Sequence, residues 1–414
     1  MVPPGTVNLS TQIDLKFGLY KPSLPLVSMP VLLGTPGYRT SAAETPGLRL
    51  TDLLSSLLAG QAAFAPPLER YKSMYRNELP VMQAPYKLDA GEGLRYAFGN
   101  HLATLIARPE QLGQSASGCV LTGAKGARFP LHKHLATHEA LFVFEGVISL
   151  FLDGSSYLLT PGDYVNIPMG TPHGYEFADH RGKLLSWTFG GNAVDAYARV
   201  GKPYAGTVYS ERDEPIDWSV LHREVDTELI ARGDSSRAHQ APKLTVAPEG
   251  IHPFVLGASE GERMIAGDQL YSILGNQTHS GGKFIALLTE GPIGPAIPRH
   301  RHEKVTELFH CLNGELEMFA EDGYLSLAPG DFLHVPPKTA HSFQLKKHDT
   351  RFLGFITPGE FEPFFHYLCE PFSGYRYPLV PFPFRFDRVI QHLGELDLTL
   401  LERPGQPVAG PARS

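Results

Sequence analysis

The sequence predicts an all-β chain of two small antiparallel β-barrels related by internal duplication, with a few peripheral helices. First, one pattern of histidines and a glutamate occurs twice, and each residue of the second copy lies 168 positions after its counterpart in the first. Second, short apolar runs separated by glycine- and proline-containing turns surround both copies, which is typical of strands. Third, 414 residues exceed what a single hydrophobic core usually serves, so more than one domain is expected.

The duplicated pattern supplies three imidazoles and one carboxylate in each copy. Such a set suits a divalent transition metal and leaves coordination positions open for water, substrate or oxygen. Iron, manganese, cobalt, nickel, copper and zinc all accept these ligands, so the sequence does not identify the metal. We therefore expect one divalent metal per barrel, with the ligands His132, His134, Glu139 and His173 in the first copy and His300, His302, Glu307 and His341 in the second.

The spacing within each copy is that of neighbouring β-strands. Residues i and i+2 of a strand point to one face, so His132 and His134 converge on the same side. Glu139 begins a strongly apolar run that predicts a buried strand. The Pro-Gly-Asp turn at 161–163 leads into a further strand that carries His173. Ligands from three neighbouring strands are thus expected to meet inside each barrel.

The duplication extends well beyond the ligands. Residues 85–206 align with 253–374 without a gap, and the matched pairs include Pro203 with Pro371. Two repeats of this length indicate two homologous domains and not a solenoid, which needs more and shorter units. The predicted organisation is an N-terminal extension at 1–84, a first barrel at 85–206, a connector with a helix at 207–252, a second barrel at 253–374, and a C-terminal tail with a helix at 375–414.

Three segments outside the barrels have helical patterns. An amphipathic stretch at 48–58 predicts a short helix in the proline-rich N-terminal extension. Asp217 in the connector and Asp387 in the tail each begin a helix-like run, and aspartate is a preferred N-cap residue. We expect the helices that follow to pack on the outside of the barrels.

Composition and charge argue against several classes of protein. The formal net charge is −7 and lysine and arginine do not cluster, which disfavours a nucleic-acid partner. No apolar run approaches the length of a membrane span, and no secretory signal is visible. The three cysteines are too few for a disulfide framework, and Cys119 and Cys311 fall in predicted core strands. We expect a cytoplasmic monomer or homodimer.

The two parts of each pattern resemble the two conserved motifs of the cupin superfamily. The first copy reads Gly-x5-His-x-His-x4-Glu-x6-Gly at 126–146 and Gly-x5-Pro-x-Gly-x2-His at 162–173. Cupins are small jelly-roll β-barrels that usually bind a metal, so the resemblance implies a bicupin. The departures from the motifs are small: Lys338 stands in place of a glycine, and Phe177 and Leu345 stand where asparagine is common.

Within this superfamily, the second repeat resembles the catalytic cupin domain of the quercetin dioxygenases (quercetin 2,3-dioxygenase, or flavonol 2,4-dioxygenase). The similar segments are 253–256, 267–271, 341–345 and the largely apolar 357–368. The resemblance covers both barrels and is closest in the second. It implies a metal-dependent, ring-cleaving dioxygenase that converts a flavonol such as quercetin to a depside and carbon monoxide. The implied partners are a small aromatic substrate and dioxygen.

The resemblance also implies roles for residues beside the metal ligands. A glutamate within reach of the flavonol 3-hydroxyl can take its proton as a general base, and Glu307, with Glu139 by symmetry, is the catalytic candidate. A planar aromatic substrate also needs an apolar slot. The substrate contacts expected from the resemblance are Phe309 and Phe343 in the second barrel and Leu141 and Tyr175 in the first. The alternative is that these four side chains only fill the barrel cores.

Two other classes of function stay open at this point. One is a different cupin metalloenzyme, such as a decarboxylase, another dioxygenase or an isomerase. A small acidic substrate would need an arginine or lysine inside the barrel, and no inward candidate is evident near the motifs. The other is a non-enzymatic bicupin. Storage bicupins commonly lose their metal ligands, whereas this chain keeps all eight.

Overall fold

The computed structural model describes residues 78–113, 116–210, 212, 214–222, 225–230, 239–320 and 323–402. All of them belong to the compact unit that begins at Ala65. The stretch at 48–58, where the sequence predicts a helix, lies outside the described residues. Within the described part of the chain, no helix is long and apolar enough to cross a membrane.

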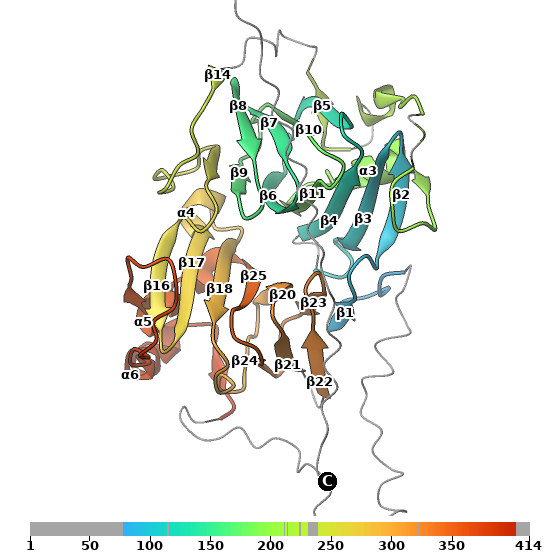
Figure 1. The fold of residues 1–414 in the computed structure, drawn as a ribbon. Coiled ribbons are helices and arrows are strands. Elements are labelled where there is room, and N and C mark those ends of the chain that lie inside the picture. The colour runs from blue at the N-terminus through green and yellow to red at the C-terminus, as the bar shows by residue number, and fades with distance from the viewer. Residues whose placement is uncertain are drawn as a thin grey trace, which may run out of the picture. The chain divides into compact units, whose positions relative to one another are not determined.

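The chain forms two β-sandwich halves of jelly-roll type, here named the first and second barrel (Figure 1). In the first, an eight-stranded and a six-stranded sheet enclose a common apolar core. Its own strands are β2 (Leu94–Phe98), β3 (His101–Ala107), β4 (Ala116–Gly123), β5 (Arg128–Lys133), β6 (His138–Glu145), β7 (Ile148–Leu152), β8 (Ser155–Leu159), β9 (Tyr164–Ile167), β10 (His173–Phe177), β11 (Lys183–Phe189) and β12 (Lys202–Pro203).

The second barrel repeats this plan with an eight-stranded and a five-stranded sheet. Its own strands are β16 (Glu262–Ala266), β17 (Gln269–Gly275), β18 (Ile285–Gly291), β19 (His300–Arg301), β20 (Thr306–Asn313), β21 (Leu316–Ala320), β22 (Gly323–Leu327), β23 (Phe332–Val335), β24 (His341–Leu345), β25 (Thr350–Thr357) and β26 (Glu370–Pro371).

Alternation of apolar and polar residues places the core between the two sheets of each barrel. In β7, Ile148, Leu150 and Leu152 are buried whereas Ser149 is exposed, because successive side chains of a strand point to opposite faces. The cysteines expected in core strands are buried and free, as predicted.

The two barrels exchange their first strands. Strand β1 (Tyr86–Leu88), which begins the first repeat, pairs antiparallel with β23 of the second barrel. Reciprocally, β15 (Phe254–Leu256), which begins the second repeat, pairs with β9 of the first barrel. If the chain is divided into domains at the repeat boundaries, the first strand of each repeat is therefore separated from the sheet with which it pairs.

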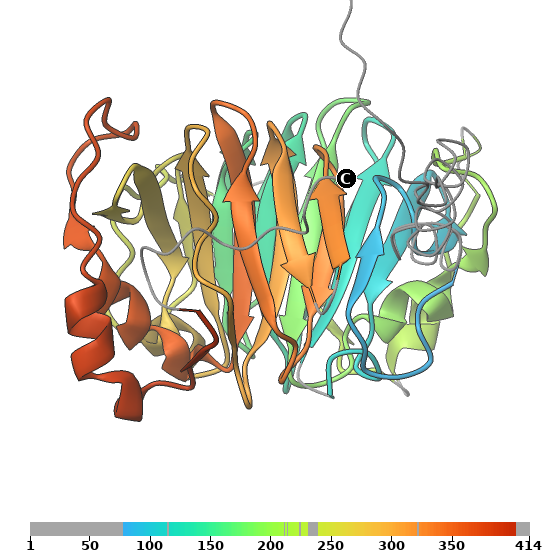
Figure 2. The same ribbon diagram turned by 90° about the horizontal axis from the view of Figure 1, so that it is seen from below.

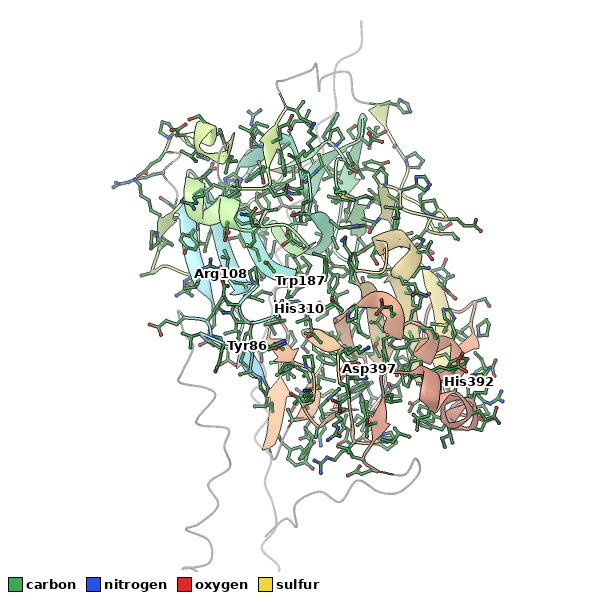
Figure 3. All side chains as sticks on the ribbon, turned by 180° about the vertical axis from the view of Figure 1, so that it is seen from behind. Tyr86, Arg108, Trp187, His310, His392 and Asp397 are labelled. Carbon is green, nitrogen blue, oxygen red and sulfur yellow. The ribbon has the colours of Figure 1, made fainter. Side chains whose placement is uncertain are left out.

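An aromatic core joins the barrels along their eight-stranded sheets. The rings of Phe189 and Phe284, one from each repeat, stack with centroids 4.1 Å apart. Trp187 is fully buried, and its Nε1–H donates to Nε2 of His310 across the junction at 3.0 Å (Figure 3). His310 has a phenylalanine, Phe142, at the matching position of the first repeat, so the duplication gives this histidine no role, yet its side chain forms part of the joint between the barrels.

The connector and the tail add further elements to both barrels. Strands β13 (Glu228–Leu229) and β14 (His239–Gln240) extend the six-stranded sheet, and β27 (Thr399–Leu400) extends the five-stranded one. The short helices are α3 (Asp195–Val200), η1 (Trp218–His222), α4 (Gln277–Ser280), η3 (Gly359–Phe361), α5 (Pro363–Leu368), α6 (Phe386–Gln391) and η4 (Leu393–Glu395). In Figure 2, the red segment with α5 and α6 lies beside the yellow strands of the second barrel.

The helices predicted after Asp217 and Asp387 exist, but their details differ. Asp217 accepts the backbone N–H of Ser219 at 3.0 Å at the start of a 3₁₀ turn. The prediction that Asp387 caps a helix is wrong: α6 begins one residue earlier, its N-cap is Arg385, and no side chain caps it. Arg385 forms ion pairs with Asp387 and with Glu370, which hold the helix start in place.

Candidate metal centres and active site

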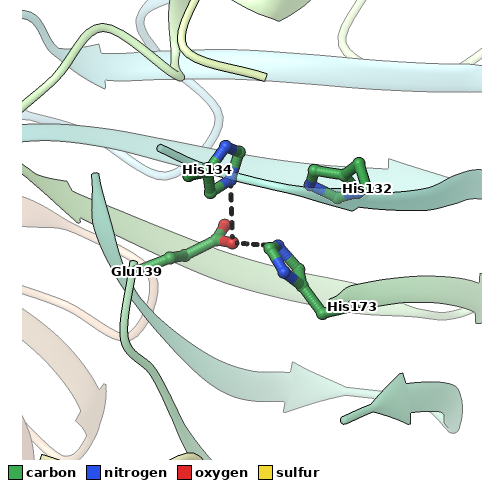
Figure 4. Close-up of side chains that lie close together, drawn as sticks. All are labelled: His132, His134, Glu139 and His173. Carbon is green, nitrogen blue, oxygen red and sulfur yellow. Dashed lines mark ion pairs between the residues drawn. The ribbon is translucent and has the colours of Figure 1, made fainter. Parts of the chain in front are cut away.

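In the first barrel, the four predicted side chains meet at one point (Figure 4). His132 and His173 lie opposite each other on β5 and β10, and their ring centroids are 4.0 Å apart. Glu139 on β6 places Oε2 2.9 Å from Nε2 of His173 and 3.5 Å from Nε2 of His134. One ligand atom from each residue lies within 4.8 Å of all the others, and all four side chains are buried.

The second barrel builds the same arrangement from β19, β20 and β24. His300 and His341 face each other across two paired strands, with ring centroids 4.3 Å apart. Oε2 of Glu307 lies 2.7 Å from Nε2 of His341, and Oε1 lies 3.8 Å from Nε2 of His302. These ligand atoms also lie within 4.8 Å of one another. The expected convergence is thus present in both barrels.

Each of the six histidines hydrogen-bonds a backbone carbonyl through Nδ1. A carbonyl only accepts, so Nδ1 carries a proton in each ring, and Nε2 is the nitrogen that faces the centre of the cluster. Metal-binding histidines usually have their second nitrogen fixed in this way. The bonds run from His132 to Pro130 (2.9 Å), His134 to Asp226 (2.8 Å), His173 to Thr171 (2.9 Å), His300 to Pro298 (2.9 Å), His302 to Asp397, and His341 to Thr339 (2.9 Å).

Charge and burial prepare the clusters for a cation. Burial alone would raise the pKa of Glu307, but the neighbouring His341 outweighs it and the pKa falls to about 2. Glu139 behaves in the same way and its pKa lies well below the ordinary value. Burial also holds the pKa of His132 and His300 well below the usual value, so both rings are neutral. Each barrel thus offers three imidazoles and one carboxylate that suit one divalent transition metal.

Two aspartates outside the repeat, which sequence reasoning missed, hold the second histidine of each motif. The backbone carbonyl of Asp397 accepts the Nδ1–H of His302, and its carboxylate accepts backbone N–H groups of residues 303–305. Asp226 does the same for His134 and for residues 135 and 136. Both aspartates stand three residues before a leucine on the strand that pairs with the metal-site strand. The two copies of this Asp-x-x-Leu motif lie 171 positions apart, whereas the repeat that contains the metal ligands has a spacing of 168. An alignment of the repeats without a gap therefore does not match the two aspartates.

The motif departure at Lys338 preserves the turn that supports His302. Lys338 has φ +70°, in the left-handed region that the glycine of the motif favours, and its counterpart Gly170 has φ +82°. Its backbone N–H donates to the carbonyl of His302 at 2.5 Å, as that of Gly170 does to His134 at 2.6 Å. The lysine therefore keeps the backbone path at some conformational cost.

A largely apolar cavity of about 80 Å³ opens beside the second cluster. His300 and Glu307 lie on its wall together with Phe309 and Phe343. The remaining lining is mainly aromatic and aliphatic: Tyr271, Leu287, Thr289, Ile297, Pro298, Leu308, Phe352, Gly354, Phe355, Ile356, Phe361, Phe364, Phe365, Leu368, Phe384, Phe386, Leu398 and Leu400.

The corresponding cavity beside the first cluster measures only about 10 Å³. His132, His134 and Glu139 line it, but Leu141 and Tyr175 do not. Both are buried in the apolar core of the first barrel. The counterparts of Phe309 and Phe343 therefore lie in the core, away from the described cavity at the first cluster.

Comparison with known proteins agrees with this architecture. The family described as Cupin domain matches residues 120–187 and 287–353, one stretch in each barrel. Quercetin 2,3-dioxygenase from Bacillus subtilis (strain 168) is 40% identical over 335 residues, which cover 80% of this chain and 99% of that protein. Quercetin 2,3-dioxygenase from Aspergillus japonicus is 33% identical over 130 residues, or 30% of this chain and 37% of that protein.

Among solved structures, the oxalate decarboxylase–formate complex from Lactobacillus farciminis matches with a TM-score of 0.44 and 15% identity, covering 66% of this chain and 86% of that one. The family assignment comes from the Bacillus relative, because its similarity spans both repeats and nearly its whole length. This chain is a bicupin enzyme and belongs to the quercetin 2,3-dioxygenase family.

Proposed function

We propose that the protein is a metal-dependent dioxygenase that cleaves the central ring of a flavonol such as quercetin, giving a depside and carbon monoxide. The observation that carries this proposal is the cavity of the second barrel, in which a carboxylate and an imidazole of the metal cluster face aromatic walls. The similarity to quercetin 2,3-dioxygenases supports the same substrate class.

In this proposal the metal is held by His300, His302, Glu307 and His341, and by the matching set in the first barrel. A divalent metal supplies a Lewis acid that lowers the pKa of a bound hydroxyl, and a redox-active one engages dioxygen. The six Nδ1–H bonds fix the imidazoles before the metal arrives, so little reorganisation is needed on binding.

Glu307 is the proposed general base of the second barrel. It is the one carboxylate among the described residues that line the cavity, and it lies beside the metal cluster where the flavonol 3-hydroxyl would arrive. The sequence assigns Glu139 the same role by symmetry. Removal of the 3-hydroxyl proton prepares the central ring for attack by oxygen.

Phe309 and Phe343 are the proposed substrate contacts, and Leu141 and Tyr175 are their counterparts in the first barrel. Phe309 and Phe343 flank Phe352 with ring centroids 5.7 and 5.2 Å away, so they form one aromatic surface. A flat aromatic molecule gains contact area against such a wall, and the wall keeps water from the reacting ring.

The cavity composition argues against a small acidic substrate such as a decarboxylase would bind. No arginine or lysine is present among the described residues that line the second cavity. An anionic substrate would therefore enter an apolar space with no paired cation, which is costly. A neutral aromatic substrate meets no such cost.

An aerobic assay on protein of measured metal content tests the proposal. Loss of quercetin absorbance should accompany equimolar oxygen uptake and release of carbon monoxide. Chelation of the metal should abolish all three signals, and re-addition should restore them. If fully metallated protein consumes no oxygen with quercetin or with any other flavonol, the proposed function is wrong.

A further inference from the structure

The two metal centres differ in the space beside them. The cavity at the second cluster measures about 80 Å³, whereas that at the first measures about 10 Å³. A cavity needs roughly 10–15 Å³ to hold a single water molecule. The described cavity at the first cluster thus has room for about one small molecule and none for a three-ring substrate.

Aromatic side chains fill the approach to the first cluster. The Phe129 ring lies 4.8 Å from the ring of His132. Trp218 of η1 and Tyr197 of α3 pack against Phe129 with centroid distances of 4.8 and 5.9 Å. In the second barrel the residue at the position of Phe129 is the smaller Ile297, which lines the open cavity.

The carboxylates of the two clusters also have different partners. Oε1 of Glu139 accepts a hydrogen bond from the Ser186 hydroxyl at 2.6 Å, while Oε2 lies 2.9 Å from Nε2 of His173. The position of Ser186 in the second barrel is Gly354, which has no side chain to donate. Among the described residues, the ion-pair partner of Glu307 Oε1 is Nε2 of His302, at 3.8 Å. Glu307 therefore keeps Oε1 for a substrate hydroxyl, whereas Ser186 occupies the matching oxygen of Glu139.

We propose that flavonol binding and turnover are confined to the second barrel, and that the first centre holds its metal without admitting the flavonol. The first centre then has a structural task, because β13 of the connector pairs with β5 and Asp226 fixes His134. This division of labour rests on the proposed function. It withdraws the catalytic role that symmetry assigns to Glu139 and the substrate role assigned to Leu141 and Tyr175.

Binding stoichiometry tests the division of labour on the intact protein. The fully metallated chain is titrated with quercetin in a calorimeter without oxygen. The expected stoichiometry is one quercetin per chain, although each chain holds two metal ions. Two quercetin molecules per chain would overturn the division while leaving the proposed function standing. No binding, together with no oxygen uptake in air, would instead remove the proposed function.

Two substitutions on the cavity walls locate the bound quercetin. Ile356→Phe adds bulk beside the second cluster and should weaken quercetin binding at least tenfold while metal content stays at two. Val194→Leu adds bulk to the small first cavity and should change neither the quercetin Kd nor turnover by more than about twofold. Unchanged quercetin binding in Ile356→Phe, or weakened quercetin binding in Val194→Leu, overturns the proposal. If Ile356→Phe does not fold, the number of quercetin molecules bound per wild-type chain still tests whether one or both barrels bind the flavonol.

An independent observation concerns the polar group at the far end of the second cavity. Thr289 is fully buried, lines the cavity, and its Oγ1 meets no hydrogen-bond partner among the described residues. Tyr271, opposite Thr289 on the neighbouring strand, already donates its hydroxyl to Gln269 at 2.8 Å. A buried hydroxyl without a partner is unfavourable, so it indicates a group that arrives with the ligand.

Strand register places Thr289 well away from the metal cluster. Through β25, Glu307 lies level with Ile285, and Thr289 is four residues further along β18. Four residues of a strand span about 13 Å at roughly 3.3 Å per residue. We infer that the Thr289 hydroxyl recognises a ring hydroxyl at the end of the flavonol that lies farthest from the metal, an inference that also rests on the proposed function.

Comparison of two flavonols tests this recognition. Thr289→Val keeps the shape of the side chain but removes the hydroxyl. It should weaken binding of quercetin roughly tenfold and leave binding of 3-hydroxyflavone, which lacks the other ring hydroxyls, unchanged. Equal effects on both ligands, or no effect on either, would contradict the inference. If the wild type binds neither compound, the fault lies with the proposed function itself.

Discussion

At the scale of single residues, the metal ligands could be predicted because their geometry is local. Side chains alternate between the two faces of a strand, so the spacing of the i, i+2 histidines and the place of the glutamate at a strand start predict which way these side chains point. The supporting aspartates could not be predicted, since Asp226 and Asp397 arrive from segments that follow the barrels at a shifted spacing. The exclusion of Leu141 and Tyr175 from the first cavity likewise depends on what packs around it.

Asp397→Ala should weaken metal binding in the second barrel by about 10- to 100-fold, the usual effect of removing a group that orients a metal ligand. The substitution leaves the N–H groups of residues 303–305 without their carboxylate acceptor and frees the loop that carries His302. Metal retained after dialysis against a chelator should fall from two equivalents toward one. Asp226→Ala is the matched control and should release the other equivalent; loss of neither ion would show that the carboxylates are dispensable.

Glu307→Gln should lower turnover of quercetin by roughly two to four orders of magnitude, the usual contribution of general acid–base catalysis. The amide keeps the size of the side chain but loses its basicity. Metal content must be measured in the same samples, because Glu307 also belongs to the metal cluster. A fully metallated variant that works at the wild-type rate would exclude Glu307 as the base.

At the scale of elements, the sequence predicts where strands occur but not which strand each one pairs with. Apolar alternation identifies the segments of β1 and β15 equally well whether they stay in their own barrel or cross to the other. Pairing depends on the docking of the two barrels, which no local pattern encodes. For the same reason, the sequence left His310 without a role although its ring lies in the joint.

Trp187→Phe should destabilise the protein by about 1–3 kcal/mol, the cost of leaving a buried polar group without its partner. The phenylalanine keeps most of the aromatic packing, but Nε2 of His310 loses the Trp187 N–H that donates to it across the joint. Denaturant unfolding followed by circular dichroism measures the change. The second tryptophan of the chain provides the control: Trp218→Phe removes an N–H that is not part of the joint and should cost less. Equal effects would indicate that packing alone matters.

At the scale of the whole molecule, several buried histidines make stability depend on pH. Burial lowers the pKa of His101 and His334 to about 4 and that of His310 to about 3. These rings stay neutral in the folded state but take up protons near pH 6.5 when the chain unfolds. The unfolded state therefore binds more protons, and stability falls as the pH drops below about 6.5.

Below that pH, the free energy of unfolding should fall by about 1.4 kcal/mol per pH unit for each such histidine, until the pH reaches the folded-state pKa. Chemical denaturation of the wild type from about pH 7.5 to about pH 5, on either side of the ordinary histidine pKa, measures how the free energy of unfolding changes with pH. His310→Gln should make the slope shallower. A slope that does not change with this substitution would mean that His310 does not contribute.

The reciprocal strand exchange has a consequence for how such a chain arises. A single copy of the repeat would present one unfilled sheet edge and one free first strand, and two copies complete each other only by association. The present chain is thus the intramolecular form of a strand-swapped dimer. When the connector joins the two copies in one chain, their association no longer depends on protein concentration, because each copy meets the other at a fixed effective concentration. Once joined, the two copies no longer need to stay identical, so one site is free to specialise while the other keeps the pair assembled.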